Sequence, residues 1–546
     1  SEVMATTLTF LGAAGTVTGS KFLLTVDERR ILVDAGMFQG EKELRRLNWE
    51  DFPVPPDTIT DILVTHAHLD HVGFLPVLVK HGFSGPIWCT RHTRDLAFIV
   101  LRDAGFLQER DAEDARLGGW SKHAQPKPLF DSQDVERTLT LLTPVDFDRD
   151  LILGEGISAR WTRAGHILGS GSIRVETPHG SVLVSGDLGR KEHPVLKPRE
   201  TPPGADVVLV ESTYGDREHM EPVNLPHEAL ADAIRRTIVR GGSVLIPAFA
   251  VDRTEIVLKE LSDMRRTGRI PRTPVYVNSP MAAAALDVYK AGVEEMRDGL
   301  DLTDIMADLR EVRTADESRA LTQGDHASSI ILSSSGMATG GRVLHHLERM
   351  LPDRRNAIVL TGYQAVGTRG RALLEGATRL KMHGRYVGVK AEIVKDEEFS
   401  VHADASELVD WVRELDPAPG IVYCVHGEKG PAAALADRIE HRVGVAAVVP
   451  DLNEVVLVEP ALTTVPADAA AIDVPGEGSA VSAAGLSVVG GRPARVDATV
   501  TLDGVALRDA HVDADLTPRQ EADGSIVFEG TLSIRLRAQG STRTPS

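Results

Sequence analysis

Short apolar runs, each soon followed by an acidic residue or a histidine, recur along this chain. They cover residues 31–33, 62–64, 182–184, 207–210 and 421–425. Runs of this length are typical of buried β-strands when turn-forming residues bound them. Because the strand ends of a shared sheet can face one crevice, we expect the side chains that follow these runs to gather there. Among these side chains are Asp34, Asp187 and Glu211.

The stretch 65–71 carries the densest chemistry. It reads Thr-His-Ala-His-Leu-Asp-His and separates the run 62–64 from the segment 72–79, which we expect to begin a helix with Pro76 near its first turn. A tight loop at a strand end can turn alternate side chains toward one point. Imidazole nitrogens and a carboxylate at that point form a site for zinc or a similar first-row metal. A solvated polar turn is the alternative, but four ligand-type residues within six positions favour the metal site.

Single residues elsewhere give weaker signals. His166 lies in a glycine-rich turn between two strand-like segments, and His426 directly follows the run 421–425. His402 lies in the stretch Glu-Phe-Ser-Val-His-Ala-Asp. Asp34 is either a surface turn residue or a carboxylate that orients a metal-binding imidazole.

The pattern of predicted secondary structure changes between about 213 and 384. Strand-like and helical segments alternate there, which predicts a parallel α/β unit. Two glycine-rich turns, 335–342 and 362–371, carry arginines beside backbone N–H groups that could approach an anion. The alternative is that both are ordinary tight turns.

Length and composition bound the class of protein. A chain of 546 residues exceeds one hydrophobic core, so we expect at least two domains. No run approaches the roughly 20 apolar residues of a membrane span, and no signal peptide is visible. The net charge of -19 excludes a broadly basic surface but not a local RNA-binding groove. We expect Cys89 and Cys424 to be buried free thiols, which fits a cytoplasmic protein.

The segment beyond about 461 differs again. It is rich in Ala, Val, Gly, Asp and Thr, with a flexible-looking stretch at 464–482 and short alternating runs at 498–502 and 525–536. This pattern predicts a linker and a small β-rich appendage, whose role the sequence does not reveal.

Taken together, the His-x-His-x-Asp-His motif at 66–71 with His166, Asp187 and His426 resembles the metallo-β-lactamase superfamily. The motifs around Glu211, 335–342, 362–371 and His402 look like those of the β-CASP nucleases, most similar to bacterial and archaeal RNases related to the endonuclease subunit of the pre-mRNA cleavage and polyadenylation factor. The resemblance covers about 5–460. It implies a four-layer αββα metallo-β-lactamase domain (4–212 and 385–460) split by an inserted α/β β-CASP domain (213–384), with the linker and appendage at 461–546.

The resemblance also implies roles for single residues. One of two Zn²⁺ ions per chain would bind His66, His68 and His166, and the other Asp70, His71 and His426, with Asp187 bridging them. A hydroxide between the metals would attack an RNA phosphodiester. Asp34 would orient the metal-binding side chains without binding metal itself. Glu211 would orient His402, and His402 would act as general acid. The implied catalytic residues are Asp70, Asp187, Glu211 and His402. The RNA-binding candidates are Ser335, Gly336, Arg342, Thr368, Arg369 and Arg371.

The expected function is therefore zinc-dependent RNA hydrolysis, endonucleolytic in RNA processing or decay. DNA cleavage, hydrolysis of a small ester or thioester, and a non-catalytic scaffold are the alternatives. The endonuclease and 5′-exonuclease modes both stay open, and the family is compatible with a homodimer. Two positions depart from the family pattern: Asp252, where Gly is common, and Asn278, where Asp is common. Either departure could alter substrate contact or rate.

Overall fold

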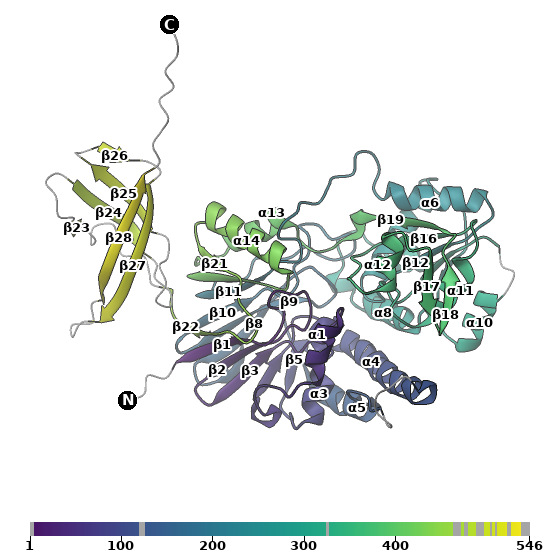
Figure 1. Ribbon diagram of the computed structural model, residues 1–546, viewed down its shortest axis with the longest axis horizontal. Coiled ribbons are helices and arrows are strands. Elements are labelled where there is room, and N and C mark those ends of the chain that lie inside the picture. The colour runs from purple at the N-terminus through teal and green to yellow at the C-terminus, as the bar shows by residue number, and fades with distance from the viewer. Residues whose placement is uncertain are drawn as a thin grey trace, which may run out of the picture.

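The computed structural model describes residues 5–119, 126–323 and 327–461 fully, and beyond them the backbone of six strands. Two seven-stranded sheets, built from residues 6–211 and 421–458, pack face to face (Figure 1). The first sheet has the order β22 (Val455–Val458), β1 (Thr6–Phe10), β2 (Phe22–Val26), β3 (Arg29–Val33), β4 (Asp61–Leu63), β5 (Ile87–Thr90), β6 (Leu142–Val145).

The second sheet mixes parallel and antiparallel strands. Its strands β21, β20, β11 and β10 are parallel, and antiparallel pairs then join β10 to β9, β8 and β7. The order is β21 (Ala446–Val448), β20 (Ile421–Val425), β11 (Val207–Glu211), β10 (Gly180–Val184), β9 (Gly171–Thr177), β8 (Ile157–Arg163), β7 (Leu151–Gly154).

The core between the two sheets contains side chains of both, such as Phe10, Trp161 and Val207. Separate clusters bury the helices that cover the outer faces, so the unit has four αββα layers. The first sheet is covered by α2 (Leu69–Val72), α3 (Leu75–Lys80), α4 (Arg91–Gly118) and α5 (Ser132–Leu141), with α1 (Lys42–Arg46), η1 (Leu47–Trp49) and η2 (Pro56–Thr58) nearby. The second is covered by α13 (Ala405–Arg413) and α14 (Lys429–Arg442).

A second α/β unit is inserted between β11 and β20. Its six strands are all parallel, and three of them are buried along their whole length, as expected for a sheet covered on both faces. The sheet order is β14 (Leu309–Glu311), β13 (Val275–Val277), β15 (Ile330–Ser333), β12 (Val244–Pro247), β16 (Ala357–Leu360), β19 (Glu392–Lys395). The helices are α6 (Glu228–Val239), α7 (Arg253–Arg266), α8 (Pro280–Ala291), η3 (Val293–Glu295), α9 (Leu302–Met306), α10 (Ala315–Gln323), α11 (Arg342–Met350) and α12 (Arg369–Leu374).

The expected boundary at 384/385 lies inside this inserted unit. The hairpin of β17 (Arg379–Met382) and β18 (Arg385–Gly388) spans it, and β19 then completes the inserted sheet beside β16. The chain returns to the sandwich only after η4 (Glu397–Phe399). The local sequence pattern does not reveal this boundary, because β19 pairs with a strand that lies about 35 residues earlier in the chain.

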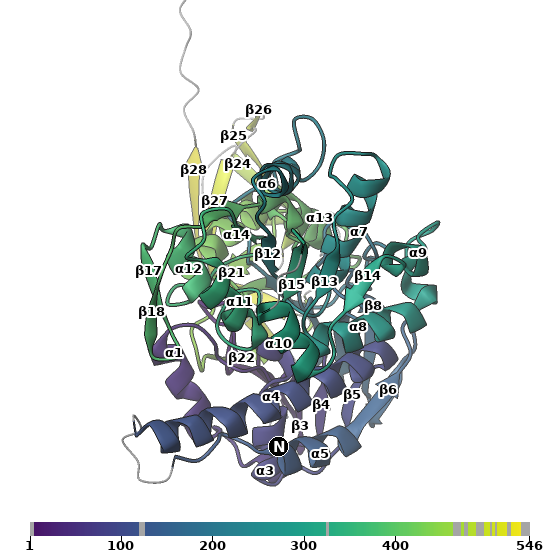
Figure 2. The ribbon, with the colours of Figure 1, turned by 90° about the vertical axis from the view of Figure 1, so that its right-hand side faces the viewer.

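The two units share one hydrophobic cluster. It contains Ile62 and Leu96 of the sandwich together with Val257 and Leu286 of the inserted unit. Helix α4 lies against α8 across this junction (Figure 2). The inserted unit is therefore packed onto the sandwich as a cap rather than tethered beside it.

The described part of the tail is all β. One sheet contains β23 (Ala471–Asp473), β24 (Ser479–Leu486), β25 (Val496–Leu502) and β26 (Val505–Leu507), and β27 (Ala510–Gln520) pairs with β28 (Ile526–Leu536). Most of the flexible stretch predicted at 464–482 lies outside the described residues. Cys89 and Cys424 are buried free thiols, as predicted. No helix in the described ranges is both long and apolar enough to cross a bilayer.

Candidate metal centre

Residues 64–68 connect β4 to α2, and Asp70 and His71 lie in α2 itself. The loop is held from below by Asp34, which directly follows β3. One oxygen of its carboxylate accepts the Thr65 N–H at 2.7 Å. The other oxygen lies 2.7 Å from both Thr65 Oγ1 and His71 Nδ1. Asp34 therefore fixes both the loop backbone and the His71 ring.

The structure brings seven of the predicted side chains into two groups that share Asp187. Asp187 Oδ2 lies 3.5 Å from His66 Nε2 and 3.6 Å from His166 Nε2. Asp187 Oδ1 faces the other way, 3.3 Å from His71 Nε2 and 3.4 Å from His426 Nε2. The first group is His66, His68, His166 and Asp187, and the second is Asp70, His71, Asp187 and His426.

These separations fit metal ions better than hydrogen bonds. Donor atoms of a tetrahedral zinc site with bonds of about 2.0–2.1 Å stand about 3.3–3.4 Å apart. His66 Nε2, both ring nitrogens of His166 and Asp187 Oδ1 are buried without any hydrogen-bond partner among the described residues. Such unpaired buried atoms are costly unless something binds them. Zinc binds imidazole nitrogens and carboxylate oxygens, so these residues fit zinc.

The pKa values of the histidines are shifted in opposite directions in the two groups. Burial lowers the pKa of His68 to about 4 and that of His166 well below its usual range, so both rings are neutral donors at neutral pH. Burial also opposes a charge on His71, but Asp187, Asp70 and Asp34 outweigh it and raise the pKa of His71 well above its usual value. The second group thus attracts a cation, and a metal ion would displace the ring proton.

Two hydroxyls that the sequence reading did not single out complete the support of the rings. Thr65 Oγ1 lies 3.0 Å from His66 Nδ1, and Thr213 Oγ1 lies 3.2 Å from His426 Nδ1. Each threonine leaves the Nε2 atom of its histidine facing Asp187. Their signal in the sequence is adjacency, since Thr65 precedes His66 and Thr213 follows Glu211 by two residues.

His402 and Glu211 form a pair beside the first group. His402 Nδ1 lies 3.1 Å from Glu211 Oε1, and the His402 ring lies 4.6 Å from the His166 ring between centroids. Glu211 is fully buried and also accepts the backbone N–H of Leu188. Burial opposes protonation of His402, but the Glu211 carboxylate outweighs it and raises the pKa of His402.

The two glycine-rich turns lie side by side in the inserted unit. Gly370 N donates to Met337 O, and the Gln364 amide donates to Gly336 O. Their arginines are largely engaged inside the protein. Arg342 donates to Asn278 Oδ1 and to two backbone carbonyls, while Arg369 donates to the carbonyls of Ala338, Thr339 and Lys381.

Of the remaining RNA-binding candidates, Gly336 is buried, whereas Ser335, Thr368 and Arg371 are partly exposed. Arg371 pairs with Glu375 at the surface and keeps about a third of its side chain exposed. Thr368 caps α12 by accepting the Arg371 N–H, and Ser335 Oγ accepts the Thr339 N–H. Asn278, one of the two departures, thus has a structural partner in Arg342.

An αββα sandwich with two donor groups joined by one carboxylate defines a metal-dependent hydrolase. Comparison with protein families agrees. A metallo-β-lactamase superfamily model matches residues 15–223, and a Beta-Casp domain model matches 255–373. A model described as a Zn-dependent metallo-hydrolase RNA specificity domain matches 386–450.

Among curated proteins, Ribonuclease TTHA0252 of Thermus thermophilus is 38% identical over 431 residues, 78% of this chain and 94% of that protein. Transcription termination factor FttA of Methanosarcina mazei is 30% identical over 449 residues, 79% of this chain and 68% of that protein. An RNase J-like protein of Methanocaldococcus jannaschii is 30% identical over 425 residues, 77% of this chain and 92% of that protein.

The chain belongs to the β-CASP family of the metallo-β-lactamase superfamily. The predicted family, fold class and enzyme class, a metal-dependent nuclease of the hydrolases, are thereby confirmed.

Proposed function

We propose that this protein is a ribonuclease that hydrolyses RNA phosphodiester bonds with two bound Zn²⁺ ions. The observation that carries the proposal is the division of the Asp187 carboxylate, one oxygen toward each donor group. Family membership and the relatives, a ribonuclease and an RNase J-like protein among them, support RNA as the substrate.

We assign the first ion to His66, His68 and His166 and the second to Asp70, His71 and His426, with Asp187 shared. When bound, the ions would activate a water molecule for attack and neutralise charge on the phosphoryl oxygens. Asp34, Thr65 and Thr213 keep the imidazoles oriented, because each bonds the ring nitrogen that does not face Asp187.

His402 serves as the general acid for the leaving oxygen in this mechanism. Its raised pKa keeps the ring protonated closer to neutral pH, and about a fifth of its side chain is exposed, so a substrate can reach it. Glu211 is a positioning residue, since its two oxygens accept from His402 Nδ1, Leu188 N and Thr213 N and so fix the ring.

The capping unit favours a polymer over a small ester or thioester as substrate, because a small substrate needs no second domain over its site. Among the candidate RNA contacts, Ser335, Thr368 and Arg371 are the best placed. Gly336 is buried, and Arg342 and Arg369 each donate to at least two backbone carbonyls, whereas Arg371 donates to one and pairs with Glu375. We propose endonucleolytic cleavage in the cytoplasm, where two free buried thiols need no oxidising compartment. A homodimer stays a prediction that light scattering would test.

Cleavage assays on labelled linear and circular RNA, with matched DNA and with or without a chelator, test this function. Chelator-sensitive cutting of the circle is the expected result. Release of mononucleotides only from the 5′ end of linear RNA would instead establish an exonuclease. No cutting of RNA by protein that holds zinc would contradict the proposal, and preferential cutting of DNA would change the substrate.

A further inference from the structure

Asp252 occupies a backbone conformation that favours glycine. Its φ is 72° and its ψ is -53°, and Arg253 N donates to Val251 O at 3.0 Å across it. This is a γ-turn with positive φ, which is rare and strained for a residue with a side chain. The turn lies at the start of α7, inside the cap. A carboxylate that persists in such a turn needs interactions that outweigh the strain.

The side chain has those interactions. Asp252 Oδ1 accepts the hydroxyl of Tyr289 at 2.6 Å, and Oδ2 accepts His193 Nε2–H at 2.9 Å. Asp252, Tyr289 and His193 are all at least 98% buried, and none of their polar atoms lacks a partner. A fully satisfied buried network of this kind holds its members in one arrangement.

The direction of each hydrogen bond is fixed by its neighbours. His193 Nδ1 accepts the backbone N–H groups of Val195 and Leu196, both at 2.9 Å, so the ring proton is on Nε2. Tyr289 donates its hydroxyl proton to Asp252 Oδ1, and its oxygen accepts the backbone N–H of Leu168 at 3.2 Å. Burial and the nearby Asp252 charge raise the pKa of Tyr289 well above its usual value, which keeps the donor proton in place.

The far end of this chain of bonds is the loop that carries His166. Leu168 is two residues beyond His166, and neither ring nitrogen of His166 has a hydrogen-bond partner in the described part of the chain. The loop is instead held through its backbone. Ser170 Oγ accepts the N–H groups of His166 and Ile167, and Tyr289 holds Leu168 from the cap.

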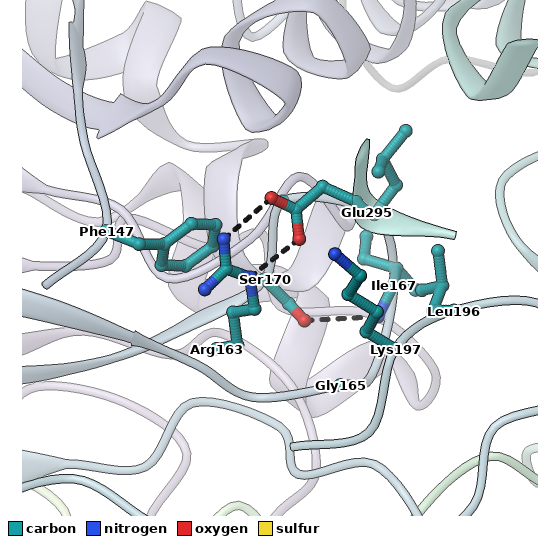
Figure 3. A pocket seen from close by; sticks show the side chains of 10 residues that line it. Phe147, Arg163, Gly165, Ile167, Ser170, Leu196, Lys197 and Glu295 are labelled. Carbon is teal, nitrogen blue, oxygen red and sulfur yellow. Dashed lines mark hydrogen bonds and ion pairs between the residues drawn. The ribbon is translucent and has the colours of Figure 1, made fainter. Parts of the chain in front are cut away.

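The cap touches the same loop at several other points. Gly292 packs so closely on the Leu168 side chain that an added Cβ would come within 3.2 Å of it. Arg163, just before the loop, forms two bonds of 2.7 and 2.9 Å with Glu295 of the cap (Figure 3). The loop is thus enclosed between the sandwich and the cap.

We propose that Asp252 is a positioning residue: through Tyr289 it holds the 165–170 loop, so that packing of the cap sets the affinity of the His66–His68–His166 group for zinc. The inference rests on the proposed two-zinc site. It makes the first metal position depend on how the two domains pack, while the His71 and His426 rings of the second are held by Asp34 and Thr213. Any substrate that shifts the cap would then shift the first zinc position selectively.

Zinc titration of the metal-depleted full chain against a chromophoric chelator tests this. His166→Ala and His426→Ala first assign the two binding steps, since each removes a donor from one group only. In Tyr289→Phe we expect the step lost in His166→Ala to weaken by about 10–100-fold, as loss of an outer hydrogen bond commonly does, while the other step is unchanged. Hydrogen exchange at the Leu168 amide should accelerate in the same variant, because that N–H loses its acceptor.

Substitutions of Asp252 separate positioning from folding. Asp252→Gly relaxes the strained turn, so its melting temperature should exceed that of Asp252→Ala, yet both should weaken the same zinc step. Combined with Tyr289→Phe, Asp252→Gly should add little to the loss, because the two act through one chain of bonds. Asp252→Asn should not restore wild-type zinc affinity, since its single amide oxygen can accept from only one of His193 Nε2–H and Tyr289 O–H.

Glu294→Gln is the matched control. It breaks another cap-to-sandwich contact, with Arg91 and His92 at the start of α4, without touching the network. We expect both zinc steps to be unchanged in it. Equal zinc affinities in wild type, Tyr289→Phe and Asp252→Gly would overturn the inference. If the wild type itself bound no zinc or cut no RNA, the proposed function would fail instead.

Discussion

The two halves of the candidate metal centre are supported in different ways. In the half with His71 and His426, each ring is held through its second nitrogen, by Asp34 of the sandwich and by Thr213 just after β11. In the half with His166, the ring has no such partner among the described residues, and its loop is held partly by Tyr289 of the cap. A metal-binding histidine can therefore be oriented through its ring or through its backbone. In the second case its orientation also depends on another domain.

The largest expected effect comes from removing the group that both halves share. Asp187→Ala takes one donor oxygen from each half, so zinc uptake and cleavage should be lost together. His68→Ala should also abolish cleavage, because it removes a donor of the first half. Metal analysis and the RNA assay measure these effects, with circular dichroism to check folding. Full activity in either variant would exclude this site.

The next effect separates catalysis from metal binding. His402→Ala should keep both zinc ions and slow cleavage by about 10²–10⁴-fold, the usual contribution of a general acid. Wild-type kcat should fall as pH rises through the raised pKa of His402, because the acid form is then lost, and this alkaline limb should be absent from the variant. Loss of metal from His402→Ala would make His402 a ligand instead.

A smaller effect should fall mainly on the His71 half. Asp34→Asn keeps an acceptor for Thr65 N–H but turns an amide N–H₂ toward His71 Nδ1. We expect zinc affinity at the second half to fall by about 10–100-fold and that of the first half to fall less, because Asp34 reaches His66 only through Thr65. This is the mirror image of the Tyr289→Phe prediction. Equal weakening of both halves by Asp34→Asn would mean that the two supports are not independent.

The smallest effects should come from the glycine-rich turns of the cap. Arg371→Ala should raise KM for RNA several-fold and reduce the salt dependence of binding by about one unit of slope. Arg342→Ala should mainly lower the melting temperature, since it leaves Asn278 Oδ1 and two carbonyls without their donor. Neither change should alter zinc affinity. A zinc effect from either would show that any disturbance of the cap reaches the site.

The fold was largely predictable from the chain itself. Apolar runs mark the buried strands, and alternation of strand and helix marks the inserted α/β unit, because these periodicities follow from local backbone geometry. The boundary near 384 was not predictable in this way. It depends on the pairing of β19 with β16, and the local sequence at 385–395 does not indicate which strand β19 pairs with.

The sequence by itself determined the donor chemistry. The clustered histidines and aspartate at 66–71 lie close in space simply because they are close along the chain. The spacing of His166, Asp187 and His426 along the chain carries no such information: the His71 and His426 nitrogens lie 3.2 Å apart although 355 residues separate them.

Only the tertiary structure decided how the donors are divided and supported. It turned the two oxygens of Asp187 toward different groups, and it engaged Arg342 and Arg369 inside the cap. It also joined Asp252 to the His166 loop through Tyr289. These contacts depend on side-chain directions across a domain interface, and no local pattern of hydrophobic and polar residues encodes such directions.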